Sequence, residues 1–141
     1  VLGKLLEAWQ EGSTFTVTGT DWPTRDGSGI RDYIHIWDLA RAHVAALERF
    51  DTLTADNGYQ VINIGTGSGV TVIELAESFE AATGRKLEVV HGPPRPGDVV
   101  GVYTVSERAK TMLGWEPEFT IPDGIRDAIA WLPKRKEMLG Y

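Results

Sequence analysis

The sequence DGSGIRDYIHIWD, residues 26–38, decides the fold and organises the rest of the chain. It opens with a glycine-rich turn, in which Gly27 and Gly29 permit backbone angles that a Cβ would forbid. Residues 31–35 are a polar run short enough to be one strand, and Asp38 is an acceptable N-cap for a following helix. That helix is predicted from residues at helical spacing, namely Leu39, Ala40, His43, Val44, Leu47 and Phe50. Turn, strand and helix in succession present an arginine on a rigid support, which is how a protein holds an anion at a chosen place.

The composition limits the kinds of protein that the chain can be. Its 141 residues fit one domain, and a domain of this size buries roughly 68–70% of its unfolded surface. The absence of cysteine removes disulfides and thiolate chemistry and is compatible with the cytoplasmic location that we predict. No run approaches the ~20 apolar residues of a membrane span. The net charge of −6 argues against nucleic-acid binding, which needs a basic face.

Predicted helices and strands alternate along the chain. The apolar spacing of residues 2–9 predicts a helix that Gly12 ends, and a chain that starts in a helix without Met or leader indicates a start within a longer protein. Short strands are predicted at 15–18, 61–64 and 87–90. We expect the strand at 61–64 to be buried on both faces, because the run is continuously apolar.

Helix signals in the second half are stronger. Thr71 and Glu74 have the spacing of a capping box, and Gly84 ends the helix that they begin. A short helix is predicted at 106–113, and a last helix begins near Pro122. Pro133 is expected to kink or end that last helix. The class is therefore α/β.

The glycine-rich segment GTGSG at 65–69 has two interpretations. A dinucleotide-binding fingerprint fits Gly65 and Gly67, but Val70 occupies the place of the third glycine. Glu88 lies about where a ribose-binding acid is found. The alternative is a tight turn between a strand and a helix, which needs no ligand. We favour the turn, because a lone and imperfect match is a weak signal.

Several motifs together resemble those of a known family. The sequence GIRDYIH at 29–35, with Asp-Leu-Ala at 38–40, resembles the C-terminal portion of UDP-glucose 4-epimerases, which are extended short-chain dehydrogenase/reductases. Other landmarks follow the family's order and separations: GTDWPT at 19–24, NIGTG at 63–67, RPGD at 95–98 and LGW at 113–115. The resemblance covers essentially the whole chain, including the terminal Gly140-Tyr141.

This resemblance implies an α/β fold that includes late elements of a Rossmann-like sheet. Residues 1–141 would be the UDP-sugar-binding C-terminal region. The family interconverts UDP-glucose and UDP-galactose through a transient 4-keto sugar, with NAD held by an N-terminal domain. Its chemistry uses a Tyr-x-x-x-Lys pair, which this sequence lacks: the fourth residues after Tyr33, Tyr59 and Tyr103 are Trp37, Asn63 and Glu107. We therefore expect a fragment that grips the UDP-sugar and is inactive alone, with catalytic and NAD-binding residues in the missing N-terminal half, and a homodimer when complete.

The resemblance also implies roles for individual residues. Arg31 and Arg95 would contact the diphosphate, and Asp98 would accept hydrogen bonds from the ribose hydroxyls. The backbone around Thr16 and Thr18 would lie beside the uracil. The remaining two substrate-binding residues would be Tyr33, near the nucleotide, and Val102, bordering the sugar.

Each of these residues also has an explanation that involves no ligand. Arg31 could pair with Asp32 or Asp26 at a strand edge, Arg95 could be a solvated loop charge, and Tyr33 could be a half-buried strand residue. His35 and His43 are expected to pack or bond locally, and the spacing of acidic residues and histidines does not match a metal site.

The position of Val102 bears on sugar size. A residue as small as valine leaves room for an N-acetylated sugar. Since side chains alternate along a strand, either Val102 or its neighbour Tyr103 faces the pocket, and both arrangements remain open.

The functional alternatives also remain open. They are the same region of another nucleotide-sugar enzyme, such as a UDP-glucuronate epimerase or a dehydratase, and a stand-alone binding module without a catalytic partner.

Overall fold

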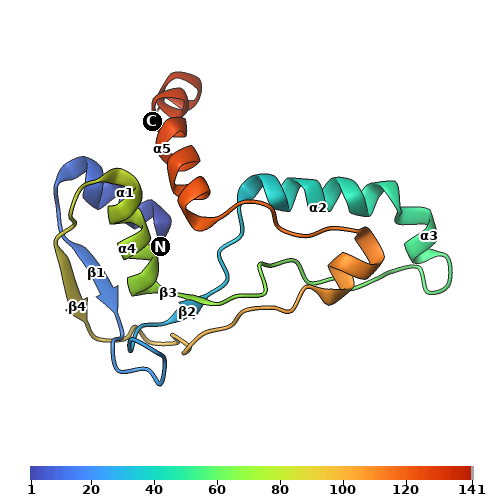
Figure 1. Ribbon diagram of the computed structural model, residues 1–141, viewed down its shortest axis with the longest axis horizontal. Coiled ribbons are helices and arrows are strands. Elements are labelled where there is room, and N and C mark those ends of the chain that lie inside the picture. Colours follow the sequence, from blue (N-terminus) through green and yellow to red (C-terminus); the bar gives the residue numbers. More distant parts are fainter. Residues whose placement is uncertain (141) are drawn as a thin grey trace.

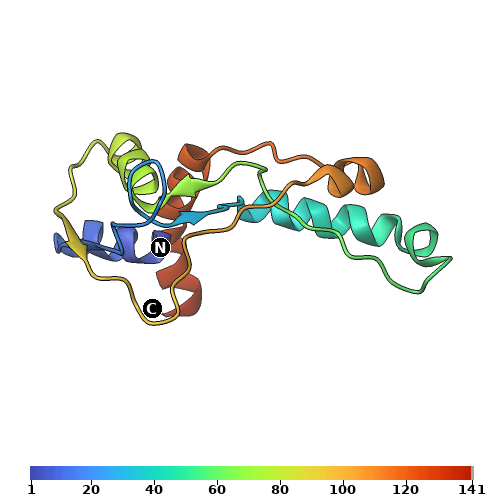
Figure 2. The same ribbon diagram turned by 90° about the horizontal axis from the view of Figure 1, so that it is seen from below.

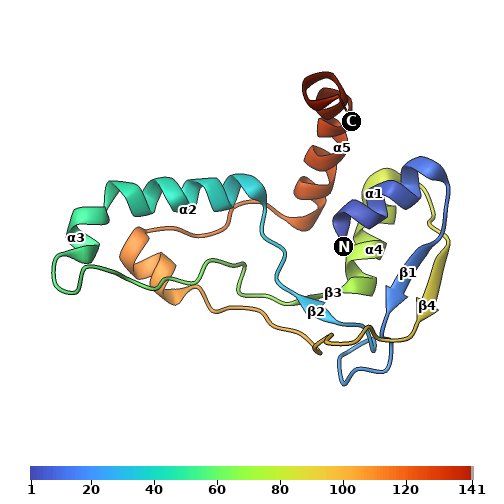
Figure 3. The ribbon, with the colours of Figure 1, turned by 180° about the vertical axis from the view of Figure 1, so that it is seen from behind.

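The computed structural model describes residues 1–140, so Tyr141 of the terminal Gly-Tyr motif lies outside the described residues. Helices and strands are gathered at two ends of an elongated molecule (Figure 1). One end contains α1, α4, β1 and β4, and the other contains α2 and α3 (Figures 1 and 3). The predicted α/β class is confirmed.

The first end is built on a pair of parallel strands. β1 (Phe15–Thr18) pairs with β4 (Val89–Gly92), with Thr16 opposite Val90 and Thr18 opposite Gly92. The strand predicted at 87–90 is therefore present but begins two residues later. α1 (Leu2–Glu11) ends at Gly12 as predicted, and α4 (Val72–Thr83) lies beside it (Figure 1).

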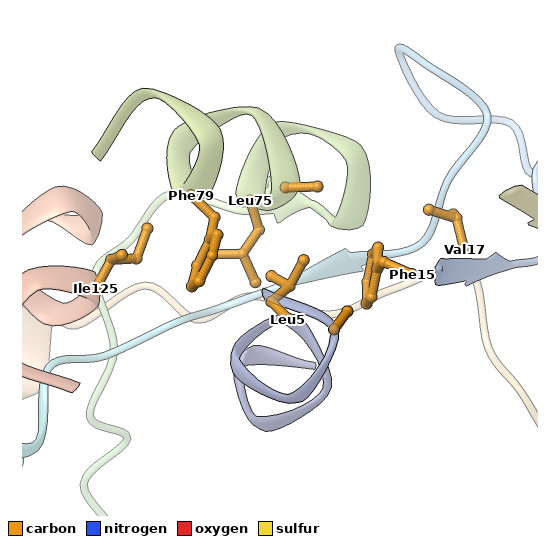
Figure 4. Packing of buried hydrophobic residues seen from close by; sticks show 8 residues of the cluster. Leu5, Phe15, Val17, Leu75, Phe79 and Ile125 are labelled. Atoms are coloured by element: carbon orange, nitrogen blue, oxygen red, sulfur yellow. The ribbon is translucent and has the colours of Figure 1, made fainter. Parts of the chain in front are cut away.

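The main hydrophobic core fills this end. Side chains from α1, β1, α4 and the last helix meet in one cluster (Figure 4), which contains Leu5, Ala8, Phe15, Val17, Leu75, Ala76, Phe79 and Ile125. Phe15 and Val17 point into the core because residues two apart in a strand share a face. The intervening Thr16 is left exposed, on the face that borders the candidate site.

The second end has a smaller core. α2 (Ile36–Glu48), α3 (Phe50–Thr54) and the π-helical turn η1 (Ala109–Leu113) surround it. Its buried members are Ala42, Ala109, Leu113 and Trp115. The predicted helix at 106–113 is thus present.

A second strand pair joins the two ends. β2 (Ile30–Arg31) and β3 (Val70–Thr71) are antiparallel and lie side by side between the two ends, closer to the first (Figure 2). Ile30 also forms a parallel bridge with Gly101. Three chain segments therefore meet beside Arg31.

The capping box on α4 is confirmed. The Thr71 hydroxyl accepts from the amide of Glu74, while the Glu74 carboxylate accepts from the amide of Thr71. Gly84 ends the helix in a left-handed conformation, as predicted.

Pro133 does not end the last helix. α5 begins at Ile121 behind a capping box of Thr120 and Asp123 and continues through Pro133 to Leu139. Pro133 is exposed, so the carbonyl left without an amide partner one turn earlier can bond to water instead.

The predicted strand at 31–35 is wrong beyond Arg31. Residues 32–35 are irregular, because the Asp32 carboxylate bonds to the amides of Thr66 and Thr104 and draws two other segments against this one.

Asp38 is not the N-cap of α2. The cap is His35, whose Nδ1 accepts from the amide of Trp37 at 3.0 Å. Asp38 lies in the first turn of the helix and is fully buried. His35 and His43 both bond locally, as expected.

The strand predicted at 61–64 is also absent. Within the described residues this segment has no strand to pair with. Ile62 and Ile64 pack on the second core, whereas Val61 is exposed. The apolar run is thus only partly buried.

No helix of residues 1–140 is long and apolar enough to span a membrane.

Candidate functional site

A pocket of about 310 Å³ opens beside β1 at the first end of the molecule. Its walls come from α1, β1, the loop before β2, and the segment after β4. Among its lining residues are Thr16, Thr18, Arg31, Arg95 and Asp98, all of them predicted site residues. Trp22, Lys4 and Val99 also line it and were not singled out by sequence reasoning.

The positions of Thr16 and Thr18 follow from strand alternation. Phe15 and Val17 are buried in the main core, so the two threonines project from the other face of β1. Their strand partners lead directly into the loop that carries Arg95. β1 and this loop therefore form adjoining walls.

Arg31 is held by backbone carbonyls. Its Nη1 donates to the oxygen of Ile30 at 2.6 Å and more weakly to that of Val99 at 3.4 Å. Among residues 1–140 it forms no ion pair, because Asp32 and Asp26, its partners in the explanation without a ligand, bond elsewhere. The guanidinium thus has no carboxylate in direct contact, although its charge adds to the hydrogen bond from Arg95 in lowering the pKa of the nearby Asp98.

Arg95 and Asp98 are joined by three hydrogen bonds. Nε and Nη2 of Arg95 each donate to a carboxylate oxygen of Asp98 at 3.2 Å, and the Arg95 amide donates to the same carboxylate at 3.0 Å. The side-chain hydrogen bond from Arg95 holds the pKa of Asp98 below its usual range. The Arg95 side chain is 69% exposed, so part of its guanidinium remains free for another anion.

A polar cluster fixes the loop that leads to Arg31. Arg25 donates to both carboxylate oxygens of Glu74 and to the carbonyl of Gly69 at 2.7 Å. Asp26 accepts from the Thr71 hydroxyl and from the amide and hydroxyl of Ser28. The loop is thereby clamped onto the start of α4.

Gly27 completes this turn. Its φ of 84° lies in the left-handed region, and a Cβ would lie 2.1 Å from the carbonyl oxygen of Thr20. No other residue fits without moving the loop, so the sequence prediction of a special backbone angle is confirmed here.

Tyr33 and Val102 do not line this pocket. The Tyr33 ring packs against the main core, and its hydroxyl is buried without a hydrogen-bond partner. This burial raises the pKa of Tyr33. Val102 is 68% exposed, whereas the ring of Tyr103 would meet a Cβ placed on Gly69. Tyr103 is the one of the two that faces a neighbouring segment.

The glycine-rich segment at 65–69 does not fit a dinucleotide. The amides of Gly65 and Thr66 donate to the Ser106 hydroxyl and the Asp32 carboxylate. A Cβ on Gly65 would lie 2.3 Å from Asp32, so the glycine makes room for the chain itself. The turn interpretation therefore accounts for this segment, and no NAD contact is assigned to it.

Residues 1–140 contain no group of three or more acidic, histidine or cysteine side chains that could hold a metal ion.

Comparison with known proteins gives consistent results. A family model described as GDP-mannose 4,6 dehydratase matches residues 4–128. The chain belongs to this family.

Within this family the chain is similar to UDP-glucose 4-epimerases. UDP-glucose 4-epimerase 3 of Oryza sativa subsp. japonica is 48% identical over 125 residues, which are 89% of this chain and 33% of the relative. The crystal structure of the Bifidobacterium longum UDP-glucose 4-epimerase with NAD+ and UDP superposes with a TM-score of 0.83 at 38% identity, covering 94% of this chain and 38% of that one. The resemblance inferred from the motifs is confirmed.

Another solved relative acts on a different sugar nucleotide. The Bacillus cereus UDP-glucuronic acid 4-epimerase, in complex with UDP-glucuronic acid and NAD, has a TM-score of 0.77 at 25% identity. It covers 94% of this chain and 39% of that one. The chain thus spans between a third and two-fifths of the length of these relatives and matches their C-terminal part.

Proposed function

We propose that the chain is the UDP-sugar-binding region of an NAD-dependent UDP-glucose 4-epimerase. The observation that carries the proposal is the pocket beside β1, in which Arg31 and Arg95 approach from separate segments. A diphosphate is a compact anion, and planar guanidinium groups bind its oxygens in pairs.

The pocket offers a division of roles. Arg31, without a carboxylate partner, and Arg95, largely exposed, bind the diphosphate. Asp98 holds Arg95 in place and offers its remaining acceptor capacity to the ribose hydroxyls. The β1 backbone around Thr16 and Thr18 lies beside the uracil. Tyr33 supports the strand end behind Arg31 through its packing on the core.

The hydride chemistry is assigned to polypeptide outside this sequence. One support is that this sequence lacks the Tyr-x-x-x-Lys pair. A second is that the amides of Gly65 and Thr66 already donate hydrogen bonds within the protein, so they are not available to bind a dinucleotide. In this proposal an N-terminal NAD-binding domain completes the enzyme, which is a cytoplasmic homodimer.

Activity assays test this division. The complete protein is expected to interconvert UDP-glucose and UDP-galactose. The isolated chain, supplied with NAD, is expected to give no turnover above a blank without protein. Turnover by the isolated chain would show that the chemistry resides in these residues and would overturn the proposal.

The second candidate is a UDP-glucuronate 4-epimerase, favoured by the likeness to the Bacillus cereus enzyme. Assaying the complete protein with UDP-glucuronate and with UDP-glucose separates the two, because a glucuronate enzyme turns over the carboxylated sugar in preference.

Val102 lies outside the pocket of Arg31 and Arg95, and we propose that in the complete enzyme it borders the sugar and sets the size that is accepted. A small, exposed valine leaves space for an acetamido group in the complete enzyme. We predict that the native enzyme turns over both UDP-galactose and UDP-N-acetylgalactosamine. Val102→Tyr should selectively lose the N-acetylated substrate. Equal activity of the tyrosine variant on both substrates would show that Val102 does not border the sugar.

A further inference from the structure

Trp22 occupies a position in the pocket that no diphosphate contact explains. It lines the same cavity as Thr16 and Thr18 on β1 and as the two arginines. Its side chain is half-buried, so part of the ring borders open space. The other wall residues provide cations, the Asp98 carboxylate, hydroxyl groups or small aliphatic groups, and Phe15 is almost fully buried in the core. Trp22 is therefore the accessible aromatic surface of this pocket.

The absence of a side chain at Gly19 makes room for the indole of Trp22. A Cβ on Gly19 would lie 2.4 Å from Nε1 of Trp22 and 3.3 Å from Cβ of Pro94. Gly19, with φ 75°, thus allows the ring to cross the backbone just after β1, next to the loop that carries Arg95. A larger residue at this position would displace the ring.

The backbone of Trp22 is also fixed. Its amide donates to the carbonyl of Gly27 at 2.9 Å, within the loop that is clamped onto α4. The indole N–H has no hydrogen-bond partner within residues 1–140. The ring is therefore held in place while its donor remains available.

The other tryptophans have different surroundings. Trp9 packs edge-on against Phe79, and Trp37 and Trp115 line a separate cavity at the other end of the molecule. Trp131 lies on α5, outside the pocket. Among the tryptophans of residues 1–140, Trp22 is thus the one that lines the cavity of Arg31 and Arg95.

We propose that the indole of Trp22 is the surface against which the planar base of the bound nucleotide packs. Bases pack favourably on aromatic side chains because every base has a π-face, and the arginines alone would bind any diphosphate equally. Trp22 thereby makes the pocket selective for a nucleoside diphosphate. This inference rests on the proposed function and adds to it the residue that recognises the base.

The test compares ligands with and without a base. Binding of UDP and of inorganic pyrophosphate is measured by calorimetry in the full-length protein that contains this chain, for native, Trp22→Ala and Trp22→Phe. Trp22→Ala should weaken UDP binding on the order of ten- to a hundred-fold, as removal of a base-stacking ring does, and leave pyrophosphate binding unchanged. Trp22→Phe keeps a ring and should recover most of the affinity. UDP should also quench tryptophan fluorescence in native protein but not in Trp22→Phe.

The control is Trp131→Phe, which should retain both UDP affinity and quenching. If UDP binds Trp22→Ala as tightly as native protein, the inference is wrong and the proposed function stands. If Trp22→Ala weakens pyrophosphate and UDP equally, the ring only supports the loop and the inference is again overturned. If native protein binds neither ligand, the proposed function itself fails.

Discussion

Arg25, Asp26, Thr71 and Glu74 form the polar clamp between the loop and the start of α4. Within this clamp, Glu74 has the most strongly shifted pKa. The hydrogen bond from Arg25 is the main cause, and it lowers the pKa of Glu74 from 4.5 to about 2. For the neighbouring Asp26, burial acts to raise the pKa, but the hydrogen bonds from Thr71 and Ser28 together outweigh it, so the pKa is lowered. Each carboxylate is thus more acidic in the folded than in the unfolded chain, and each stabilises the fold only while ionised.

The clamp should therefore weaken in acid. A depressed pKa contributes stability that is fully present above about 4.5 and is lost as the pH falls towards about 2. Because the pair is partly exposed and screened, its contribution is on the order of 0.5–1 kcal/mol. Glu74→Gln should flatten the fall of the unfolding free energy across this pH range, as measured by urea denaturation. Glu77→Gln, on the exposed side of the same helix, is the control. Identical pH profiles for native and Glu74→Gln would contradict the assignment.

At the scale of elements, Asp38 joins α2 to the segment before α5. Its buried carboxylate accepts from the amides of Glu118 and Phe119 at 3.0–3.1 Å and from Arg41 at 2.9 Å. Its backbone carbonyl accepts from Nε1 of Trp115. Close by, the ring of His35 stacks on Phe119 at 4.5 Å. The two segments are thus connected by polar bonds as well as by packing.

Removing this carboxylate should be costly. Asp38→Ala removes the acceptor of two part-buried amides and one of the two carboxylate partners of Arg41, so we predict a loss of about 1–3 kcal/mol in unfolding free energy. Asp38→Asn keeps one acceptor oxygen and should lose less, which allows a measurement if the alanine variant does not fold. Asp51→Ala, on the exposed α3, should change stability by less than about 0.5 kcal/mol. The unfolding free energies are measured by urea denaturation. A loss below about 1 kcal/mol for Asp38→Ala would show that this carboxylate does not connect α2 to the segment before α5.

The sequence predicted those elements whose causes are local. The capping box of Thr71 and Glu74 and the glycine ends of α1 and α4 depend on residues a few positions apart, and each is present. Asp38 has the chemistry of an N-cap, but its carboxylate bonds to amides 80 and 81 residues away, which no local pattern reveals. The strand expected at 61–64 failed for a similar reason, because a strand requires a neighbour to pair with. For the pocket, the family motifs pointed to both arginines, whereas Trp22 and Arg25 emerged only from their contacts.

At the scale of the whole molecule, the second end exposes apolar side chains. The outer face of α2 and the 59–61 segment carry Ile36, Trp37, Val44, Leu47, Tyr59 and Val61, each more than half exposed. An apolar surface of this kind generally marks an interface. The proposed N-terminal domain would account for it, since the chain covers about a third of the length of its plant relatives.

The isolated chain should consequently self-associate. Light scattering is expected to show oligomers, and the double variant Val44→Lys with Leu47→Lys should be more nearly monomeric, because charges on the outer face of α2 oppose its burial. A coexpressed N-terminal half should likewise suppress self-association of the native chain. A monodisperse native monomer of high thermal stability would contradict the prediction, because it would show that this apolar surface is stable in contact with water.

The proposed function depends on the two arginines of the pocket, which hold the diphosphate. Calorimetric titration of the full-length protein with UDP tests it most directly. Arg31→Ala and Arg95→Ala should each weaken binding by roughly 1.5–3 kcal/mol, about ten- to a hundred-fold, and lysine at either position should recover little because it lacks the planar donor pair. Arg108→Ala, which removes an exposed arginine outside the pocket, should leave the affinity unchanged. Unchanged UDP affinity in both pocket variants would contradict the account.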